Sequence, residues 1–233
     1  MKSIVILPTY NEKDNIKNLI REIFNLLPDI HILVVDDNSS DGTTTLVEEL
    51  QARTNNLHLI VRKDERGRGL AGITGFKYAI EHKFDYVVEM DADFSHNPKY
   101  IRLLLNQVES FDVVIGSRLV KGGRISGRNF LRNIITKLAN IYIGLVLGIK
   151  IKDATSGFRC FKAKVLEDIP WDKLISIGPS VIEEVLYIAH KNNYKIQEVP
   201  IVFEERRRGA SKLNFKKMVD TFVLILKIRY RYA

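Results

Sequence analysis

Short runs of apolar residues alternate along the chain with longer stretches whose apolar positions recur at helical spacing. The runs are rich in valine and isoleucine, which predicts strands at residues 3–7, 31–35, 57–61, 86–90 and 113–115. The stretches between them predict helices at residues 15–27, 43–53, 69–82 and 98–109. Strands and helices that take turns predict an α/β fold, with a mostly parallel central sheet and helices on both faces.

The alternation lapses after residue 116. A polar, glycine-rich stretch leads to an apolar helix at about 130–147, and Ser180 with Glu183 predicts a capping box that opens a later helix. A strand at 197–203 and a last helix from about Phe215 complete the pattern. No linker separates these parts, so we expect one domain over 1–233, in which residues 1–116 bind a nucleotide and the second half completes the site.

Two aspartates, Asp91 and Asp93, follow the strand at 86–90. Extended backbone puts both carboxylates on the same side, with Ala92 pointing away. Carboxylates this close repel unless a cation neutralises them, and Mg²⁺ or Mn²⁺ suits oxygen ligands and a substrate diphosphate. The alternative is a pair of solvated turn residues before the helix at Pro98. We favour the metal, because parallel sheets bind ligands at the carboxyl ends of their strands.

Polar residues also follow the first two strands. Asp36 and Asp37 end the second strand, and Asp41 already suffices to cap the next helix. We assign Asp37 to the ribose hydroxyls or base edge of a nucleotide, and Tyr10 and Glu12 to the base in the same cleft.

Gly67, Gly69 and Gly72 form a literal G-x-G-x-x-G. A dinucleotide fingerprint follows the first strand directly, whereas this motif comes after the third, so we expect these glycines to open a helix instead.

Composition and charge narrow the classes of protein. The hydrophobic content of 45% and charged content of 27% are typical of a globular chain, and the single cysteine, Cys160, excludes an internal disulfide. No secretory signal precedes Pro8. The net charge of +8 favours anionic partners. Two apolar stretches, at 139–149 and 221–228, are shorter than the roughly 20 residues of a spanning helix. Their basic borders fit an anionic membrane surface, and packing on the core is the alternative.

Basic residues are scattered through the second half, and fixed guanidinium groups suit a cleft that must hold several phosphates. Four of them stand in loops or helices away from the predicted sheet: Arg118, Arg132, Arg206 and Lys212. Solvated surface is the alternative for each. Glu183 and Glu184 are candidates for a general base, but the predicted capping box already accounts for Glu183.

Taken in order, the motifs resemble the dolichol-phosphate (polyprenyl-phosphate) mannosyltransferases of glycosyltransferase family 2. They are Leu-Pro-Thr-Tyr-Asn-Glu from residue 7, Val-Asp-Asp-Asn-Ser-Ser-Asp-Gly-Thr from 35, Met-Asp-Ala-Asp-Phe-Ser-His from 90, Gly-Ser-Arg from 116, Thr-Ser-Gly-Phe-Arg from 155, and Arg206 through Ser211-Lys212. The resemblance implies a nucleotide-diphospho-sugar transferase (GT-A type) fold. It also implies inverting, metal-dependent transfer of mannose from GDP-mannose to a polyprenyl or dolichyl phosphate.

The resemblance also implies roles for single residues. The guanosine would be held by Pro8, Tyr10, Glu12, Val35 and Asp37. The ribose, the diphosphate and Mg²⁺ or Mn²⁺ would be held by Asp91, Ala92 and Asp93, with Ser95 as a third metal ligand. Donor and acceptor phosphates would be bound by Arg118, Arg132, Arg206 and Lys212. Among these, Asp93, Arg118 and Arg132 are expected to act in catalysis, Arg206 and Lys212 on the donor, and Arg118, Arg132 and Lys212 on the acceptor phosphate.

Further expectations follow for the partners. Residues 117–214 would bind the acceptor and its phosphate, and 215–233 would form an amphipathic helix in contact with the cytoplasmic face of a membrane. Small membrane-anchoring subunits are a further possible partner. The acceptor phosphate is largely ionised at neutral pH, since its second pKa is near 6, so no general base is needed.

Three alternatives stay open from the sequence. The sugar could be glucose from UDP-glucose, or another donor of family 2. A basic nucleic-acid-binding module fits the positive charge but leaves the acidic loops unexplained, so we expect no nucleic acid. A membrane-surface protein without catalysis is the third.

Overall fold

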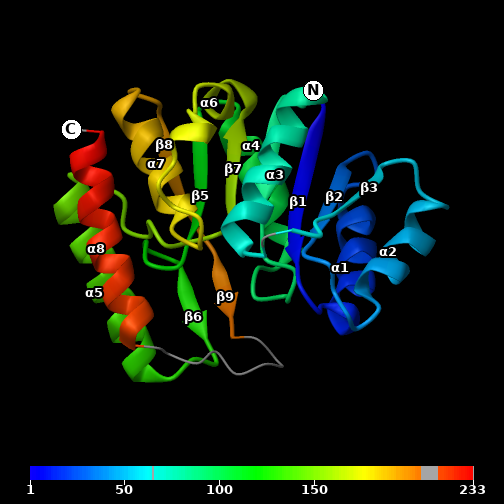
Figure 1. Ribbon diagram of the computed structural model, residues 1–233, viewed down its shortest axis with the longest axis horizontal. Coiled ribbons are helices and arrows are strands. Elements are labelled where there is room, and N and C mark those ends of the chain that lie inside the picture. The colour runs from blue at the N-terminus through cyan, green and yellow to red at the C-terminus, as the bar shows by residue number, and fades with distance from the viewer. Residues whose placement is uncertain (65, 206–214, 233) are drawn as a thin grey trace.

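The computed structural model describes residues 1–64, 66–205 and 215–232. A seven-stranded sheet forms its centre, in the order β3-β2-β1-β4-β7-β5-β8. Its strands are β1 (Ser3–Thr9), β2 (His31–Asp36), β3 (Leu57–Val61), β4 (Tyr86–Glu89), β5 (Val113–Ser117), β7 (Arg159–Lys162) and β8 (Ile196–Pro200). All neighbouring pairs are parallel except the two that involve β7. The predicted α/β fold with a mostly parallel sheet is confirmed (Figure 1).

Helices cover both faces of the sheet. They are α1 (Lys13–Leu26), α2 (Thr43–Gln51), α3 (Arg68–Glu81), α4 (Ile101–Val108), α5 (Phe130–Leu147), α6 (Ala163–Glu167), α7 (Val181–Lys191) and α8 (Phe215–Arg231), with short 3-10 turns at Pro98–Tyr100 and Trp171–Lys173. Alternate residues of β1 face opposite sides, as a strand requires. Ile4 and Ile6 belong to the buried cluster that includes residues of α3 and α7, whereas Val5 and Leu7 belong to the one that includes residues of α1 and α4.

The strand β7 was not predicted. It runs antiparallel between β4 and β5, and Cys160 is paired with both Val88 and Val114. The neighbouring Arg159 is fully buried and donates hydrogen bonds to the backbone carbonyls of Ser156, Ala154 and Ile182. Burial lowers the pKa of Arg159 to about 10, so the guanidinium stays charged at neutral pH. It therefore fixes the segment before β7 against the start of α7.

The predicted single strand at 197–203 is two strands. β8 ends at Pro200 and pairs with β5, while β9 (Val202–Glu204) pairs with β6 (Arg124–Ser126) in a separate two-stranded sheet. Between them Ile201 is buried, and its amide donates to the carbonyl of Ser117. Pro200 is still paired with Ser117, and β8 is the edge strand of the large sheet, so the missing N–H of Pro200 costs no hydrogen bond to β5. The chain crosses to the second sheet directly after Ile201.

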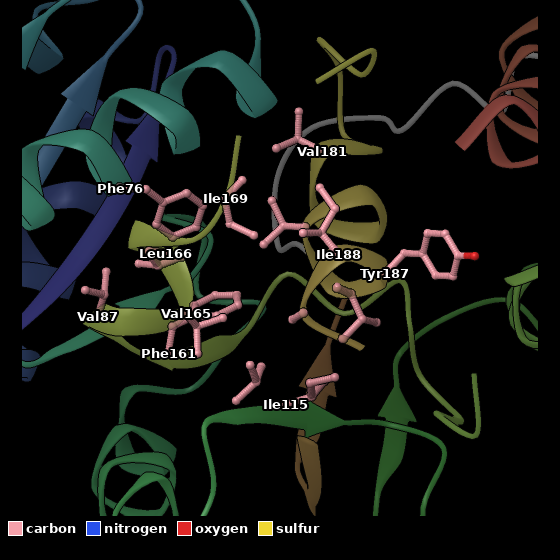
Figure 2. Packing of buried hydrophobic residues seen from close by; sticks show 14 of the residues in the cluster. Phe76, Val87, Ile115, Phe161, Val165, Leu166, Ile169, Val181, Tyr187 and Ile188 are labelled. Carbon is pink, nitrogen blue, oxygen red and sulfur yellow. The ribbon is translucent and has the colours of Figure 1, made fainter. Parts of the chain in front are cut away.

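The last helix packs beside α5 and α7 (Figure 1). Tyr142 of α5 donates to the carbonyl of Phe222 at 2.9 Å. On α7, Ile188 and Tyr187 leave the helix in opposite directions (Figure 2), and both side chains are buried. The hydroxyl of Tyr187 accepts a hydrogen bond from Arg229 of α8. The side chain of Tyr232 donates to the buried Glu184 at 2.8 Å. Among the described residues, these hydrogen bonds attach α8 and the residue that follows it to the domain.

The predicted helix at about 130–147 is confirmed as α5. The helix begins before the apolar stretch at 139–149, so the expectation that this part of the chain is too short for a membrane span is wrong by length and composition. The 18 residues of α5 have a mean hydropathy of 1.3, and only 17% of them are buried. By length and composition it is the one helix of the described chain that meets the criteria for a membrane span. Its apolar side chains are strongly exposed at Phe130, Leu131 and Leu145.

Candidate active site

A cleft of about 630 Å³ lies at the carboxyl ends of β1, β2 and β4. It is lined by Pro8, Thr9, Tyr10, Glu12, Asp37, Arg68, Ala71, Asp91, Ala92, Asp93, Arg128, Thr155, Gly157, Pro179 and Ile182. The predicted polar loops therefore do meet at one edge of the sheet. Of the residues expected to bind a sugar nucleotide, Pro8, Tyr10, Glu12, Asp37, Asp91, Ala92 and Asp93 line it, while Val35 is a buried residue within β2.

The two aspartates at the end of β2 have different environments. Asp36 is fully buried and accepts hydrogen bonds from the hydroxyls of Thr9, Ser39 and Thr44. Asp37 faces the cleft, and it accepts from Arg62 at 2.6 Å and from the amide of Gly67 at 2.7 Å. Asp36 thus holds the loop together, which leaves Asp37 as the cleft carboxylate, as predicted.

Tyr10 stands at the mouth of the cleft with nearly half of its surface exposed. Arg66 covers one face of its ring, with the guanidinium carbon 4.9 Å from the ring centroid. One guanidinium nitrogen also donates to the Tyr10 hydroxyl at 2.9 Å. The segment after β3 therefore reaches over the part of the cleft assigned to a base.

Arg68 links Glu89, the last residue of β4, to Asp91, which follows the strand. Its Nε donates to Oδ1 of Asp91 and its Nη1 to Oε1 of the buried Glu89, both at 3.0 Å. Burial alone would lower the pKa of Arg68, but the charges of Glu89 and Asp91 raise it above its ordinary value. The pKa of the Glu89 carboxyl is also raised, but here burial has the larger effect and outweighs the lowering by the charge of Arg68.

Close packing explains two glycines of the predicted motif. A Cβ on Gly69 would lie 2.0 Å from the carbonyl oxygen of Gly178, and one on Gly72 would lie 2.6 Å from Oε1 of Glu89. Both glycines lie in α3, so the expectation that the motif opens a helix is confirmed. The absent side chain of Gly69 lets α3 approach the backbone at Gly178, and that of Gly72 leaves room for the carboxylate of Glu89.

The turn after Asp91 is held by backbone contacts. The amide of Asp91 donates to Nδ1 of His96 at 3.1 Å, and the amide of Ser95 donates to Oδ1 of Asp93 at 3.0 Å. Burial lowers the pKa of His96, which agrees with an Nδ1 that accepts a hydrogen bond. Phe94 has a φ of 62°, unusual for a bulky residue, and so turns the chain sharply beside Asp93.

The donor atoms at this turn suit a hard divalent cation. Asp91 and Asp93 supply carboxylate oxygens, and Oγ of Ser95 is buried with no hydrogen-bond partner in the described part of the chain. Among the described residues, no cluster of three or more His, Cys, Asp or Glu side chains has a metal-binding arrangement. Mg²⁺ and Mn²⁺ need no such cluster, since they retain waters and take oxygens from a substrate diphosphate. The residues present therefore fit such an ion.

The predicted phosphate-binding residue Arg118 forms a buried ion pair. Its Nε and Nη2 donate to the two carboxylate oxygens of Asp153 at 2.8 and 2.6 Å. Nη2 also donates to the hydroxyl of Thr155 at 2.7 Å, and the side-chain amide of Asn140 donates to the same hydroxyl at 3.0 Å. Thr155 faces the cleft, so this cluster forms part of its wall.

The other predicted basic residues are spread over several elements. Arg132, in the first turn of α5, donates to Glu205 at 2.7 Å. Arg206 and Lys212 lie outside the described residues. Arg128, which the sequence did not single out, lines the cleft and donates to the hydroxyl of Thr136 at 3.0 Å. Apart from the positive charge of Arg128, nothing in the sequence just before α5 indicated that this residue lines the cleft.

The predicted capping box at Ser180 and Glu183 is wrong. Within the described chain, the Ser180 side chain makes no cap hydrogen bond. Glu183 is buried instead, with one carboxylate oxygen that has no partner among the described residues, and burial raises the pKa of its carboxyl to about 7. Glu184 accepts from the amides of Ile175 and Ser176 and so fixes the loop that precedes α7.

Comparison with known proteins places the chain in a family. Residues 4–170 match Glycosyl transferase family 2, and the chain belongs to that family. It is 38% identical over 215 residues to the polyprenol monophosphomannose synthase of Mycolicibacterium smegmatis, covering 91% of this chain and 81% of the relative. It is 39% identical over 227 residues to the dolichol-phosphate mannosyltransferase of Pyrococcus furiosus, covering 94% of this chain but only 61% of that longer protein.

Solved structures show the same fold at low sequence identity. Glucosyl-3-phosphoglycerate synthase of Mycobacterium tuberculosis, in complex with Mn²⁺, uridine diphosphate and glucosyl-3-phosphoglycerate, superposes with a TM-score of 0.70 at 18% identity over 99% of this chain and 79% of that one. The mannosyltransferase PcManGT of Pyrobaculum calidifontis, in complex with GDP-Man and Mn²⁺, gives a TM-score of 0.55 at 18% identity over 99% and 73% of the two chains. The GT-A type of fold is thereby confirmed.

Proposed function

We propose that this protein transfers mannose from GDP-mannose to the phosphate of a polyprenyl phosphate, with inversion at the sugar carbon. The observation that carries the proposal is the meeting of Asp37, Asp91 and Asp93 in one cleft at the carboxyl ends of the strands. The names of the two relatives, at 38% and 39% identity, support the sugar and the class of acceptor.

The donor fills the cleft from β2 to β4. Asp37 accepts from the ribose or the base, Tyr10 stacks on the base, and Pro8 and Glu12 complete the nucleoside pocket. The expected contact of Val35 with the guanosine is not part of this proposal, because its side chain is buried within β2. Asp91 and Asp93 hold Mg²⁺ or Mn²⁺, with Ser95 close by. When bound, this ion neutralises the diphosphate and makes it a better leaving group. The Mn²⁺ complexes of the two solved structures support the use of a divalent ion.

The acceptor phosphate is the nucleophile. An oxygen of the ionised phosphate forms a bond to the anomeric carbon, while the bond from that carbon to the diphosphate breaks and GDP leaves with the electron pair. No proton has to be removed, so Glu183 is not required as a base. Arg118 and Arg132 hold the acceptor phosphate. Arg206 and Lys212 bind the donor diphosphate, and Lys212 also binds the acceptor phosphate. The protein therefore acts mainly by orienting the two substrates and stabilising the charge of the leaving group.

A lipid acceptor requires contact with a membrane. Exposed apolar side chains on two adjacent helices support this contact: Phe130, Leu131 and Ile134 on α5, and Val223, Leu226 and Tyr230 on α8. Basic residues beside them suit an anionic surface. We place the protein on the cytoplasmic face of a membrane, with small anchoring subunits as further partners.

The proposal assigns one role to each of three segments of the domain. Residues 1–116 bind the nucleotide, 117–214 bind the acceptor and its phosphate, and 215–233 contact the membrane. Glucose from UDP-glucose is the second candidate donor.

The test is transfer of labelled sugar from GDP-mannose, and in parallel from UDP-glucose, to a polyprenyl phosphate in detergent. Organic-extractable label from GDP-mannose alone is expected. Label from UDP-glucose alone would overturn the choice of sugar, and absence of transfer from both would overturn the proposed reaction.

A further inference from the structure

A guanidinium group lies in the donor cleft directly beside the carboxylates that suit a divalent ion. Arg68 lines the cleft together with Asp91 and Asp93. Its Nε and its Nη2 each lie 3.0 Å from the same oxygen, Oδ1 of Asp91. The side chain of Arg68 is 26% exposed, so its charge is accessible from the cleft. One of the two carboxylates of the metal site therefore already has a cation of the protein beside it.

Neighbours on two sides hold this guanidinium in place. Its Nη1 donates to Oε1 of Glu89 at 3.0 Å, and Glu89 is buried at the end of β4. The loop before β7 closes on another side, since a Cβ on Gly157 would lie 2.6 Å from Nη2. Departure of Arg68 would take a hydrogen-bond donor away from a buried carboxyl group, which is costly. Arg68 therefore stays beside Asp91 when a ligand enters the cleft.

The charge of Arg68 acts in opposite directions on the two ligands of this part of the cleft. A divalent ion bound by Asp91 and Asp93 is repelled by the guanidinium, so the ion alone binds more weakly than the two carboxylates would otherwise allow. A diphosphate is attracted by the same guanidinium, so it binds more tightly when no ion is present. When both ligands are bound, the repulsion and the attraction largely cancel.

We propose that Arg68 sets the order of binding at the donor site: it disfavours the free divalent ion and favours the diphosphate, so the ion enters with the donor or after it. This inference rests on the proposed function for the metal site and for the diphosphate of the donor. Arg68 forms and breaks no covalent bond in this role. It supplies a fixed positive charge that prepares the empty cleft for an anion and keeps a lone cation out.

The test measures the affinity for each ligand separately. Binding of Mn²⁺ without nucleotide is followed by electron paramagnetic resonance, and binding of GDP with a chelator is followed by calorimetry. Because Arg68→Met leaves the buried Glu89 without its partner, the comparison is between Glu89→Gln and the double variant Arg68→Met with Glu89→Gln. Loss of Arg68 should tighten Mn²⁺ binding about tenfold and weaken GDP binding about tenfold, since one charge acts on ligands of opposite sign.

A matched control removes a positive charge from the same helix at a distance from the cleft. Lys77 of α3 pairs with the exposed Asp172 at 3.2 Å and does not line the cleft. Lys77→Met should therefore bind Mn²⁺ and GDP like wild type. A shift of either affinity by Lys77→Met as large as that caused by loss of Arg68 would show a general effect of net charge and overturn the inference.

The opposite signs distinguish a charge effect from damage to the site. Weaker binding of both ligands after loss of Arg68 would show a purely structural role and overturn the inference, as would two unchanged affinities. Absence of Mn²⁺ binding to every protein, even with GDP present, would overturn the metal site of the proposed function together with this inference. Opposite shifts in proteins that transfer no sugar would support the inference and overturn the proposed reaction.

Discussion

Arg68 holds Asp91 through its Nε at 3.0 Å and at the same time reaches Glu89 through its Nη1. One guanidinium thus compensates the buried carboxylate at the end of β4 and the cleft carboxylate two residues further on. Glu89 is only 1% exposed, so its charge has little access to water when Arg68 is absent.

Replacing Arg68 by methionine should therefore destabilise the fold. Removal of one partner of a buried ion pair costs about 3 kcal/mol or more, because the other charge stays buried and uncompensated. The free energy of unfolding, measured with urea, should fall by that order. Arg68→Met combined with Glu89→Gln should recover part of the loss, and equal stability of the single variant and wild type would contradict the ion-pair account.

Arg66 should contribute to nucleotide binding. It packs on Tyr10 at 4.9 Å and so helps to hold this ring for stacking on a base. A cation–π contact at an exposed site is worth about 0.5–1 kcal/mol and more when water is excluded, so Arg66→Ala should weaken GDP binding about threefold to tenfold. Calorimetric titration with GDP checks this, with the exposed Lys63→Ala as a control from the same segment. An unchanged dissociation constant for Arg66→Ala would show that the contact is incidental.

Stability should depend on pH through two histidines far from the cleft. Nδ1 of His31 lies 3.0 Å from Nε2 of His58, so the pair shares one hydrogen bond when both rings are neutral. Burial lowers the pKa of both rings below 6.5, with smaller contributions from Lys2 to both and from His82 to His58. The unfolded chain then binds more protons in acid, so this stabilisation is present above pH 6.5 and is lost as the pH falls through the lowered values.

The measurement is the midpoint of thermal unfolding between pH 8 and pH 5. Wild type should lose stability below pH 6.5, and His31→Gln should flatten that loss, whereas the exposed His190→Gln should not. A wild-type midpoint that rises in acid would contradict the sign of the argument.

The sequence predicted the sheet because its strands are short apolar runs separated by long helical patterns. It did not predict β7, because a four-residue strand that begins with Arg159 is too short to show a recognisable alternation of apolar and polar residues. The division of residues 197–203 into β8 and β9 was also missed, because the pattern stays apolar across Pro200 while the chain changes sheets.

The acidic part of the cleft was predictable for a physical reason. Parallel strands end at the same edge, so Asp37, Asp91 and Asp93 had to come close once the strands were recognised. The partners of these residues were not predictable. Arg66 precedes, and Arg68 lies inside, a glycine motif that suggested only a helix start. The burial of Glu183 depends on tertiary packing that overrides its local capping pattern.

The central claim is that Asp91 and Asp93 bind the donor diphosphate through a divalent ion. It is tested most directly by the rate of mannose transfer from GDP-mannose to polyprenyl phosphate, measured at saturating substrates for wild type, Asp93→Asn and the exposed control Asp29→Asn, each with Mg²⁺ or Mn²⁺ and with a chelator. The account predicts that the chelator abolishes transfer by wild type and that Asp93→Asn lowers the rate at least about a hundredfold, as for loss of one group that stabilises developing charge. Asp29→Asn should transfer like wild type. Transfer by Asp93→Asn at the wild-type rate, or transfer that persists with the chelator, would contradict the claim.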